Sequence, residues 1–134
     1  MGAATYWPPK GGFMVTNLHV AGSTHYFGQE YMLMLDCGAV EFNSAEIQLV
    51  REPHNKDDAN AISIWGNGVC GRQLLGYVNR NQAVTVARCL DYGGKVIIDG
   101  HRICGRDKDC YGMYLHAEVL FWKDLKARAA QNIT

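Results

Sequence analysis

The sequence predicts a mainly β domain, a small barrel of about six strands with two short flanking helices. Three observations lead to this prediction. Short segments rich in branched and aromatic residues recur along the chain, bounded by glycine, asparagine and aspartate. These segments do not alternate regularly with helical patterns, as a parallel sheet would require. The 134 residues include 15 glycines and are 48% hydrophobic, which suits one turn-rich domain with its own core.

The N-terminal part of the chain is expected to hold an arm and two strands. Residues 1–12 are expected to be a flexible arm, because its prolines favour extended backbone and a Gly-Gly pair allows a hinge. The domain itself is expected to span residues 13–122. Partial alternation of apolar residues predicts its first strand at 13–20, and a second strand is expected at 31–36.

The centre of the chain is organised around a polar loop between two strands. Alternation predicts a strand at 46–50 that buries Ile47 and Leu49. Pro53 cannot donate a backbone hydrogen bond, so this strand is expected to end before it. Asparagine and aspartate, which bond to their own backbone in turns, fill the loop that follows. The next strand is expected at 61–65.

A helix is expected in the second half of the chain. A glycine-rich turn at 66–68 precedes a short strand at 74–78. Asn79 or Asn81 can cap a helix that continues to Asp91, with apolar residues at steps of three and four.

The C-terminal part is expected to add two strands and a second helix. Branched residues predict a strand at 95–98, and the polar, basic segment 101–112 is interpreted as a loop or exposed hairpin. The last strand is expected at 113–122, followed by a helix and tail at 123–134. These patterns predict one core that contains Leu49, Ile62, Ile64, Val78, Val84, Leu90, Ile97 and Leu120.

The charge of the chain is unevenly distributed. The net charge is zero, which is unusual for a general nucleic-acid binder. Residues 1–60 hold three Lys or Arg and seven Asp or Glu, a charge of −4, whereas residues 61–134 hold ten and six, a charge of +4. An anionic ligand is therefore expected on the face that the second half builds.

The cysteines and the chain start indicate the compartment. Five scattered cysteines without a Cys-x-x-Cys pair are typical of reduced thiols rather than of a disulfide framework. No segment approaches the roughly 20 apolar residues of a membrane span. No secretion signal is evident at the N-terminus. We therefore expect an intracellular protein, in the cytoplasm or nucleus, without a membrane partner.

The sequence contains none of the common catalytic motifs, such as a nucleophile elbow, a zinc-protease helix, a Walker loop or a Rossmann loop. A nuclease built on His54, Asp57 and Asp58 would lack a lysine or third carboxylate at a recognisable spacing. The histidines and cysteines between residues 101 and 116 match no common zinc module. The expectation is a non-enzymatic domain with no catalytic residue, metal ion or cofactor.

The central loop carries a long ordered motif. It consists of Arg51-Glu52-Pro53, Asn55, Asp58 and Asn60-Ala61-Ile62, followed by Gly76-Tyr77-Val78 and a helix. This motif resembles the signature of HIRAN domains, and the resemblance covers about residues 15 to 122. It implies an OB- or SH3-like barrel flanked by helices. It also implies a DNA-binding module of the kind found in fork-remodelling enzymes and in small bacterial or phage proteins.

The resemblance implies roles for single residues. Asp58 lies where a DNA-binding member uses an aspartate to accept a hydrogen bond from a terminal 3′-hydroxyl, and a carboxylate repels phosphate. Tyr26 matches a tyrosine that stacks on a base, and Arg80 matches a phosphate-contacting position at a helix N-terminus. The nucleic-acid-binding surface is expected to comprise His25, Tyr26, Phe27, Arg51, Asp57, Asp58, Asn60, Tyr77, Arg80 and Arg102.

Three positions depart from the pattern of that DNA-binding member. His25 stands in place of an arginine, and Asp57 replaces a stacking tyrosine. Ile103-Cys104 lies where the member has a phenylalanine, although Trp65 or Tyr77 could substitute for a missing ring. We therefore expect micromolar rather than nanomolar affinity for DNA.

Two functions from different classes follow from these patterns. The first is a non-catalytic module that binds single-stranded DNA or a DNA 3′-hydroxyl end, in a repair, replication or phage-related context. A protein partner would then supply motor or nuclease activity. The alternative is a protein-interaction module that uses the barrel face around Trp65 and Tyr77. The salt dependence of binding separates the two functions, because phosphate contacts weaken steeply with salt.

Overall fold

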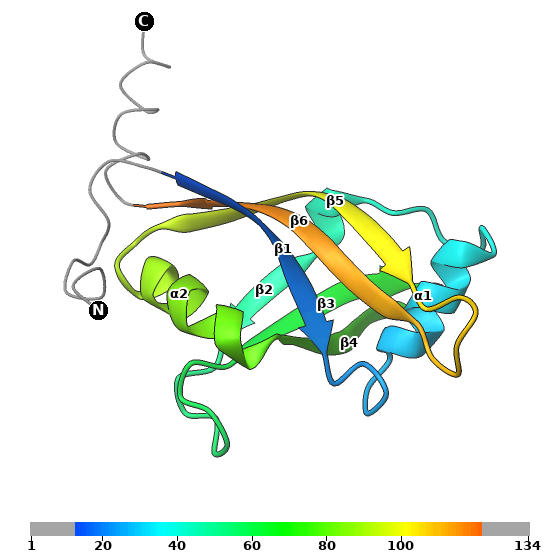
Figure 1. The fold of residues 1–134 in the computed structure, drawn as a ribbon, viewed down its shortest axis with the longest axis horizontal. Coiled ribbons are helices and arrows are strands. Elements are labelled where there is room, and N and C mark those ends of the chain that lie inside the picture. The colour runs from blue at the N-terminus through cyan, green and yellow to red at the C-terminus, as the bar shows by residue number, and fades with distance from the viewer. Residues whose placement is uncertain (1–12, 122–134) are drawn as a thin grey trace, which may run out of the picture.

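The computed structural model describes residues 13–121, which form one curled sheet with two α-helices (Figure 1). The predicted arm at 1–12 and the predicted helix and tail at 123–134 lie outside these residues. In chain order the elements are β1 (Phe13–Ala21), α1 (Gly28–Asp36), the 3₁₀ turn η2 (Ser44–Glu46), β2 (Gln48–Arg51), β3 (Ile62–Gly68), β4 (Gly71–Val78), α2 (Arg80–Asp91), β5 (Lys95–Cys104) and β6 (Gly112–Leu120).

The described strands form one sheet of six, in the order β2-β3-β4-β1-β6-β5, and every neighbouring pair is antiparallel. β1 joins the two halves of the sheet, because its residues 13–19 pair with β6 while Val20 and Ala21 pair with β4. The sheet curls into a half-barrel whose free edges are β2 and β5, and the two α-helices lie at opposite ends of it (Figure 1). The predicted mainly β fold class is confirmed.

The core fills the concave side of this half-barrel. Its largest fully buried side chains include Leu18, Met32, Ile62, Ile64, Leu75, Met113, Leu115 and Leu120. Of the residues predicted for the core, Ile62, Ile64, Val78 and Leu120 are buried, and Leu49 and Leu90 are partly buried against it.

Two predicted core residues do not belong there. Val84 is 40% exposed, since α2 buries a stripe one residue away that contains Ala83, Val86 and Ala87. Ile97 is only partly buried, because Ile98 takes the core side of β5.

The segment predicted as a strand at 31–36 is the helix α1 (Gly28–Asp36). The adjacent side chains of Tyr31 and Met32 are both buried, whereas a strand would send them to opposite faces. Gly28 lets the helix start against β4, because a Cβ on this residue would lie 2.3 Å from the carbonyl oxygen of Leu75. The run Tyr-Met-Leu-Met-Leu is too short for its periodicity to separate helix from strand.

Of the two alternatives predicted for residues 101–112, a loop or an exposed hairpin, the structure has the hairpin, and the turn predicted at 66–68 is displaced along the chain. The polar segment 101–112 is not all loop, because β5 continues to Cys104 and pairs with β6 up to Cys104↔Gly112. Within this extension Arg102 pairs with Tyr114 on the outer face, whereas His101 shares the face of the buried Ile103 and stacks on Phe42, so a polar residue also lies on the inner face. The turn predicted at 66–68 lies at residues 69–70, beyond the Gly68↔Gly71 pair.

The helix α2 begins as predicted. The side chain of Asn79 accepts a hydrogen bond from the backbone N–H of Asn81 at 3.0 Å, and Arg80 is the first helical residue. The backbone N–H of Asn79 in turn donates to the carbonyl of His19 at 2.9 Å. The helix start, and with it Arg80, is therefore fixed to the end of β1.

Candidate nucleic-acid interface

The loop between β2 and β3 is shaped by the side chain of Asn55. Its Oδ1 accepts hydrogen bonds from the backbone N–H groups of Asp57 at 2.9 Å and Asp58 at 3.2 Å. Its Nδ2 donates to Oε1 of Glu52 at 3.0 Å. The asparagine side chain thus replaces backbone partners inside the turn, and it determines where the two aspartates lie.

The base of the same loop is closed by backbone and arginine contacts. The N–H of Glu52 donates to the carbonyl of Ala61 at 2.9 Å. Arg51 donates from Nη1 to the carbonyl of Ala59 at 2.6 Å, and its Nε and Nη2 contact the two carboxylate oxygens of Asp91 at 3.0 and 3.1 Å. Arg51 therefore joins the loop to the end of α2 through a bidentate ion pair.

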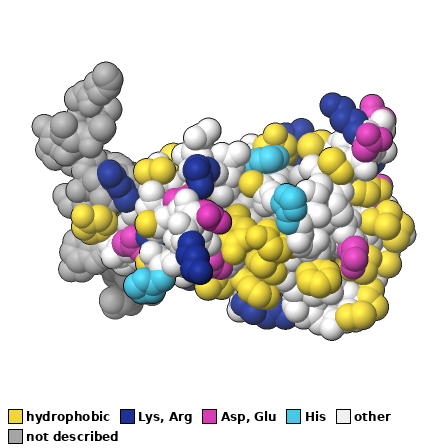
Figure 2. All heavy atoms as spheres, turned by 90° about the horizontal axis from the view of Figure 1, so that it is seen from below, with side chains coloured by type: hydrophobic (Ala, Val, Ile, Leu, Met, Phe, Trp, Pro, Cys, Tyr) yellow, Lys and Arg dark blue, Asp and Glu magenta, His cyan; other side chains and the backbone are white. Residues whose placement is uncertain are grey.

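Four segments of the chain meet around a cavity of about 210 Å³, here called the loop pocket. They are the end of β1, the β1–α1 loop, the β2–β3 loop and the β4–α2 junction. The loop pocket is lined by Ala21, Tyr26, Asn55, Asp57, Asp58, Ala61, Tyr77, Val78 and Arg80. The face of the molecule that carries these loops is seen in Figure 2, where hydrophobic side chains gather beside charged side chains of both signs.

One wall of the loop pocket is aromatic. The ring of Tyr26 lies 5.6 Å from the ring of Tyr77, tilted by 55°, and Tyr26 is 42% exposed. The hydroxyl of Tyr77 donates to Glu52, with Oε1 at 3.1 Å. Burial, together with the Glu52 carboxylate, raises the pKa of Tyr77 to about 12. The hydroxyl therefore stays protonated and holds its ring in place, while the ring of Tyr26 stays open to a ligand.

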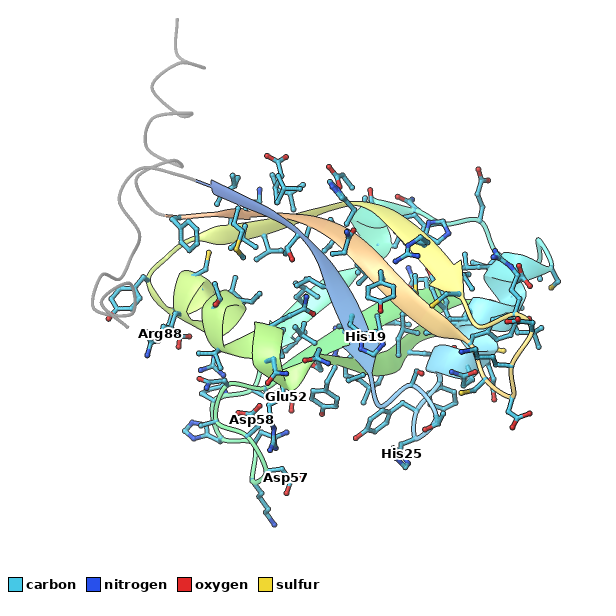
Figure 3. The ribbon with its side chains drawn as sticks, in the orientation of Figure 1. His19, His25, Glu52, Asp57, Asp58 and Arg88 are labelled. Atoms are coloured by element: carbon cyan, nitrogen blue, oxygen red, sulfur yellow. The ribbon has the colours of Figure 1, made fainter. Side chains whose placement is uncertain are left out.

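The carboxylate behind this wall is ionised. Burial acts to raise the pKa of Glu52, but hydrogen bonds from Asn55, Ser63 and Tyr77 outweigh burial and leave the pKa lowered. A charged carboxylate accepts from both Tyr77 and Asn55, so the same group fixes the aromatic wall and the polar loop. Figure 3 shows Glu52 and Asp58 on this loop, near the end of β1 where His19 lies.

The opposite wall is polar and holds one cation close to a carboxylate. Nη2 of Arg80 donates to the carbonyl of Asp57 at 3.0 Å, and its Nε lies 3.6 Å from Oδ2 of Asp58. Oδ1 of Asp58 accepts from the N–H of Asn60 at 2.9 Å. The side chain of Arg80 is 70% exposed and that of Asp58 is 21% exposed. The guanidinium can therefore reach a ligand from solvent, and the carboxylate offers an acceptor from within the cavity.

The structure gathers half of the predicted binding surface and leaves the rest outside the loop pocket. Tyr26, Asp57, Asp58, Tyr77 and Arg80 line it. The exposed His25 and Phe27 flank Tyr26. The side chain of Arg51 is bound to Asp91, and Asn60 donates its backbone N–H to Asp58. Arg102 lies on β5, over the ring of Tyr114.

Two residues that organise the site were not predicted for it. Glu52 and Asn55 belong to the motif, yet only the folded loop brings them to Tyr77 and to the aspartate N–H groups. The pairing of an acidic residue with an asparagine three positions later, next to a proline, was the available signal of an Asx-type turn.

The described residues add no metal centre or membrane segment to this picture. Residues 13–121 contain no group of three or more His, Cys, Asp or Glu side chains arranged to hold a metal ion. In that same range, no helix is long and apolar enough to cross a membrane.

Comparison with known proteins agrees with the motif. The model of the HIRAN domain family matches residues 14–120. The chain is also similar to the solved HIRAN domain of human HLTF, with 25% sequence identity and a TM-score of 0.53 over 89% of this chain and 88% of that chain. No curated protein sequence matches the chain. The chain therefore belongs to the HIRAN domain family, a family of nucleic-acid-binding modules.

Proposed function

We propose that this domain binds the 3′-hydroxyl end of a DNA single strand in the loop pocket, without catalysing a reaction. The base at the end of the strand stacks on Tyr26, Arg80 contacts a backbone phosphate, and Asp58 accepts a hydrogen bond from the terminal hydroxyl. The observation that carries this proposal is the loop pocket itself. It joins an open aromatic ring, a solvent-accessible guanidinium and a carboxylate within one small cavity.

The charges of the loop pocket favour a strand end over a continuing strand. Asp57 and Asp58 contribute two carboxylates and Arg80 one cation, so the lining has an excess of negative charge. A phosphate placed against Asp58 would be repelled, whereas a hydroxyl can donate to it. Arg80 stands at the N-terminus of α2, where free N–H groups and the helix dipole also favour an anion. This arrangement supports a phosphate at Arg80, at the rim of the loop pocket, and a hydroxyl at Asp58, inside it.

The size of the loop pocket supports recognition of a short terminal segment. Its volume of about 210 Å³ is below the range of roughly 300 to 1,000 Å³ that is typical of sites that enclose a drug-sized ligand. Tyr26 is the exposed ring of its aromatic wall, because Tyr77 is tied to Glu52. We therefore expect micromolar affinity for a short strand.

A protein-interaction surface around Trp65 and Tyr77 has less support. Both side chains are half-buried, and the hydroxyl of Tyr77 is bound to Glu52. Nε1 of Trp65 donates to Oγ of Ser63 at 2.9 Å, and the guanidinium of Arg72 covers its ring at 4.2 Å. Arg72 is held over the ring of Trp65 by its hydrogen bond to Gln48, and Tyr77 is held by Glu52, so these two rings offer a protein partner little free apolar surface.

The test is a binding comparison by fluorescence anisotropy. Three probes of one sequence are used: a single strand with a 3′-hydroxyl, the same strand with a 3′-phosphate, and a blunt duplex. We expect the hydroxyl strand to bind best, with an affinity that falls as salt rises. Equal binding of hydroxyl and phosphate ends would overturn end recognition. Absence of binding to every probe at low salt would overturn the nucleic-acid function and favour the protein-interaction alternative.

A further inference from the structure

Three side chains lie side by side on the outer face of the β1-β6-β5 part of the sheet. The register pairs His19 of β1 with Tyr114 of β6, and Tyr114 with Arg102 of β5. Their neighbours Leu18, Leu115 and Ile103 are buried, so the alternation of the strands directs these three outward. We call His19, Tyr114 and Arg102 the outer row. Since adjacent strands are about 4.8 Å apart, the outer row is about 10 Å long.

The outer row combines a ring with a cation. The guanidinium of Arg102 lies over the ring of Tyr114, 4.8 Å from its centroid, and Arg102 is exposed. The ring of His19 lies 5.1 Å from the same ring at 50°. An aromatic ring beside an arginine is the pairing that proteins use to stack a base and contact its phosphate without sequence preference.

The outer row is continuous with the loop pocket along β1. Ala21 lines both the loop pocket and a second cavity of about 610 Å³ between the β1–α1 loop and the β5–β6 hairpin. His19 and Lys108 line that second cavity as well. Because His19 and Ala21 are two residues apart on one strand, they share a face at a spacing of about 7 Å. A strand that left the loop pocket along this face would therefore reach the outer row next.

The backbone beneath the outer row is held in place. The N–H of His19 donates to Oε1 of Gln82 at 2.8 Å, and Nε2 of Gln82 donates to the carbonyl of Asn17 at 2.7 Å. Gln82 belongs to α2, the helix that begins with Arg80. The outer row and the cation of the loop pocket are therefore fixed to each other through one helix.

A second pairing of arginine and aromatic ring shows why the outer row is distinctive. Arg72 covers Trp65 at 4.2 Å on β4 and β3, but its Nε is bound to Gln48 at 2.7 Å. The indole N–H of Trp65 is bound to Ser63. Neither residue lines the loop pocket or the second cavity. The Arg72–Trp65 pair thus provides a matched control with the same chemistry in another place.

We propose that the outer row is a second contact for nucleic acid, in which Arg102 moves from the face of Tyr114 to bind a phosphate and the uncovered ring stacks a base. It takes the part of the strand that extends in the 5′ direction from the terminal nucleotide. This inference rests on the proposed function, because it assumes that the 3′ end occupies the loop pocket. It adds a length requirement that the loop pocket alone does not impose: a strand must be long enough to pass the second cavity before it gains the added affinity.

The experiment measures affinity against strand length with 3′-hydroxyl oligothymidines from about two to about eight nucleotides. Wild-type affinity should rise with length once the strand reaches the outer row. Tyr114→Leu and Arg102→Gln should each reduce the affinity for the longest strand by at least about fivefold. Neither should change the affinity for the shortest strand. Tyr114→Phe should keep the length effect because the ring remains, and Arg72→Gln should keep it because the Arg72–Trp65 pair lies elsewhere.

Two further arms separate the possible outcomes. When the shortest strand is extended with abasic units, its affinity should rise only by the part that depends on the phosphate contact of Arg102, because stacking requires bases. A photoreactive base placed upstream of the end should cross-link to a peptide that contains Tyr114. If short strands bind but the gain with length is the same in Tyr114→Leu, Arg102→Gln and wild type, the outer row is overturned and the loop pocket stands. If no strand binds at any length, the proposed function and the outer row fail together. Thermal melting checks that each variant is folded.

Discussion

The hydroxyl of Tyr77 donates to Oε1 of Glu52 at 3.1 Å, across 25 positions of the chain. Glu52 starts the loop that carries the two aspartates, and Tyr77 supports the ring of Tyr26. This one hydrogen bond therefore connects the polar and the aromatic walls of the loop pocket. Because its acceptor is a carboxylate, it belongs to the stronger class of hydrogen bonds.

Tyr77→Phe should loosen both walls while leaving the ring in place. Loss of a hydrogen bond to a charged group costs about 1.5 to 3 kcal/mol of unfolding free energy, which urea denaturation measures. Strand binding should weaken in the same variant. Tyr92→Phe is the control, because Tyr92 is 57% exposed at the end of α2 and does not line the loop pocket. A stability equal to that of the control would show that the Tyr77–Glu52 bond contributes nothing net.

The pH dependence of stability should reflect Glu52. Its pKa is lowered in the folded protein from the ordinary value of 4.5, so between the two values the unfolded chain binds more protons. The contribution is therefore complete above about pH 4.5 and is lost as the pH falls through the folded value. Glu52→Gln should flatten the unfolding free energy against pH in this acidic window. Glu41→Gln, which removes a carboxylate at an exposed position outside this hydrogen-bond network, is the control.

Asp58→Asn should remove the discrimination between strand ends. The asparagine oxygen can still accept from the N–H of Asn60, so the loop keeps its shape, but the charge that repels phosphate is gone. Binding of a 3′-phosphate strand should stay equal or improve, and the preference for a 3′-hydroxyl should vanish. Asp57→Asn is the comparison variant. It also removes one carboxylate from the lining, but it keeps the backbone carbonyl of residue 57 that accepts the hydrogen bond from Arg80. If Asp58→Asn keeps the hydroxyl preference, another group recognises the end.

Arg80→Ala should weaken the binding of every strand regardless of sequence. Removal of one phosphate contact should also reduce the slope of log affinity against log salt by about one counterion. Arg88→Ala is the matched control, since Arg88 lies in the last turn of the same helix, away from the loop pocket (Figure 3). An unchanged salt slope in Arg80→Ala would remove Arg80 from the phosphate contacts.

Ile62→Ala should destabilise the domain by about 2 to 5 kcal/mol, through lost burial and the cavity left behind. Ile62 is fully buried at the start of β3, directly after the β2–β3 loop, whereas Val84 is 40% exposed on α2. Val84→Ala should therefore melt close to wild type. Equal melting temperatures for the two variants would contradict the assigned core.

Sequence patterns predicted most of the strands, but they predicted the wrong element where the run of apolar residues was too short to show a period. The strand before Pro53 and the helix capped by Asn79 depend on local chemistry that a sequence displays directly, namely a missing donor and a capping side chain. The helix α1 depends instead on the contact of Gly28 with the backbone of Leu75, nearly fifty positions later in the chain. No local pattern records such a contact, so apolar residues there were interpreted as a strand.

The candidate site shows the same division. The family resemblance pointed to Tyr26, Asp58 and Arg80, and the fold brings all three to one cavity. Arg51 belongs to the same motif, yet its guanidinium is bound to Asp91 and to loop carbonyls. A residue that braces a loop and a residue that contacts a ligand look alike in a sequence, because both are polar and both stand beside the turn. Only the partner of each side chain distinguishes the two roles.

The pairing of Phe13 with Leu120 determines how this domain can be joined to other chains. Facing residues of an antiparallel pair lie about 5 Å apart, so the backbone enters and leaves the sheet at nearly one point. The loop pocket begins at Ala21, at the other end of β1 and about 27 Å away along the strand. The domain can thus be inserted into a surface loop of another protein without moving the two ends of that loop apart. The loop pocket of such a fusion would point away from its host.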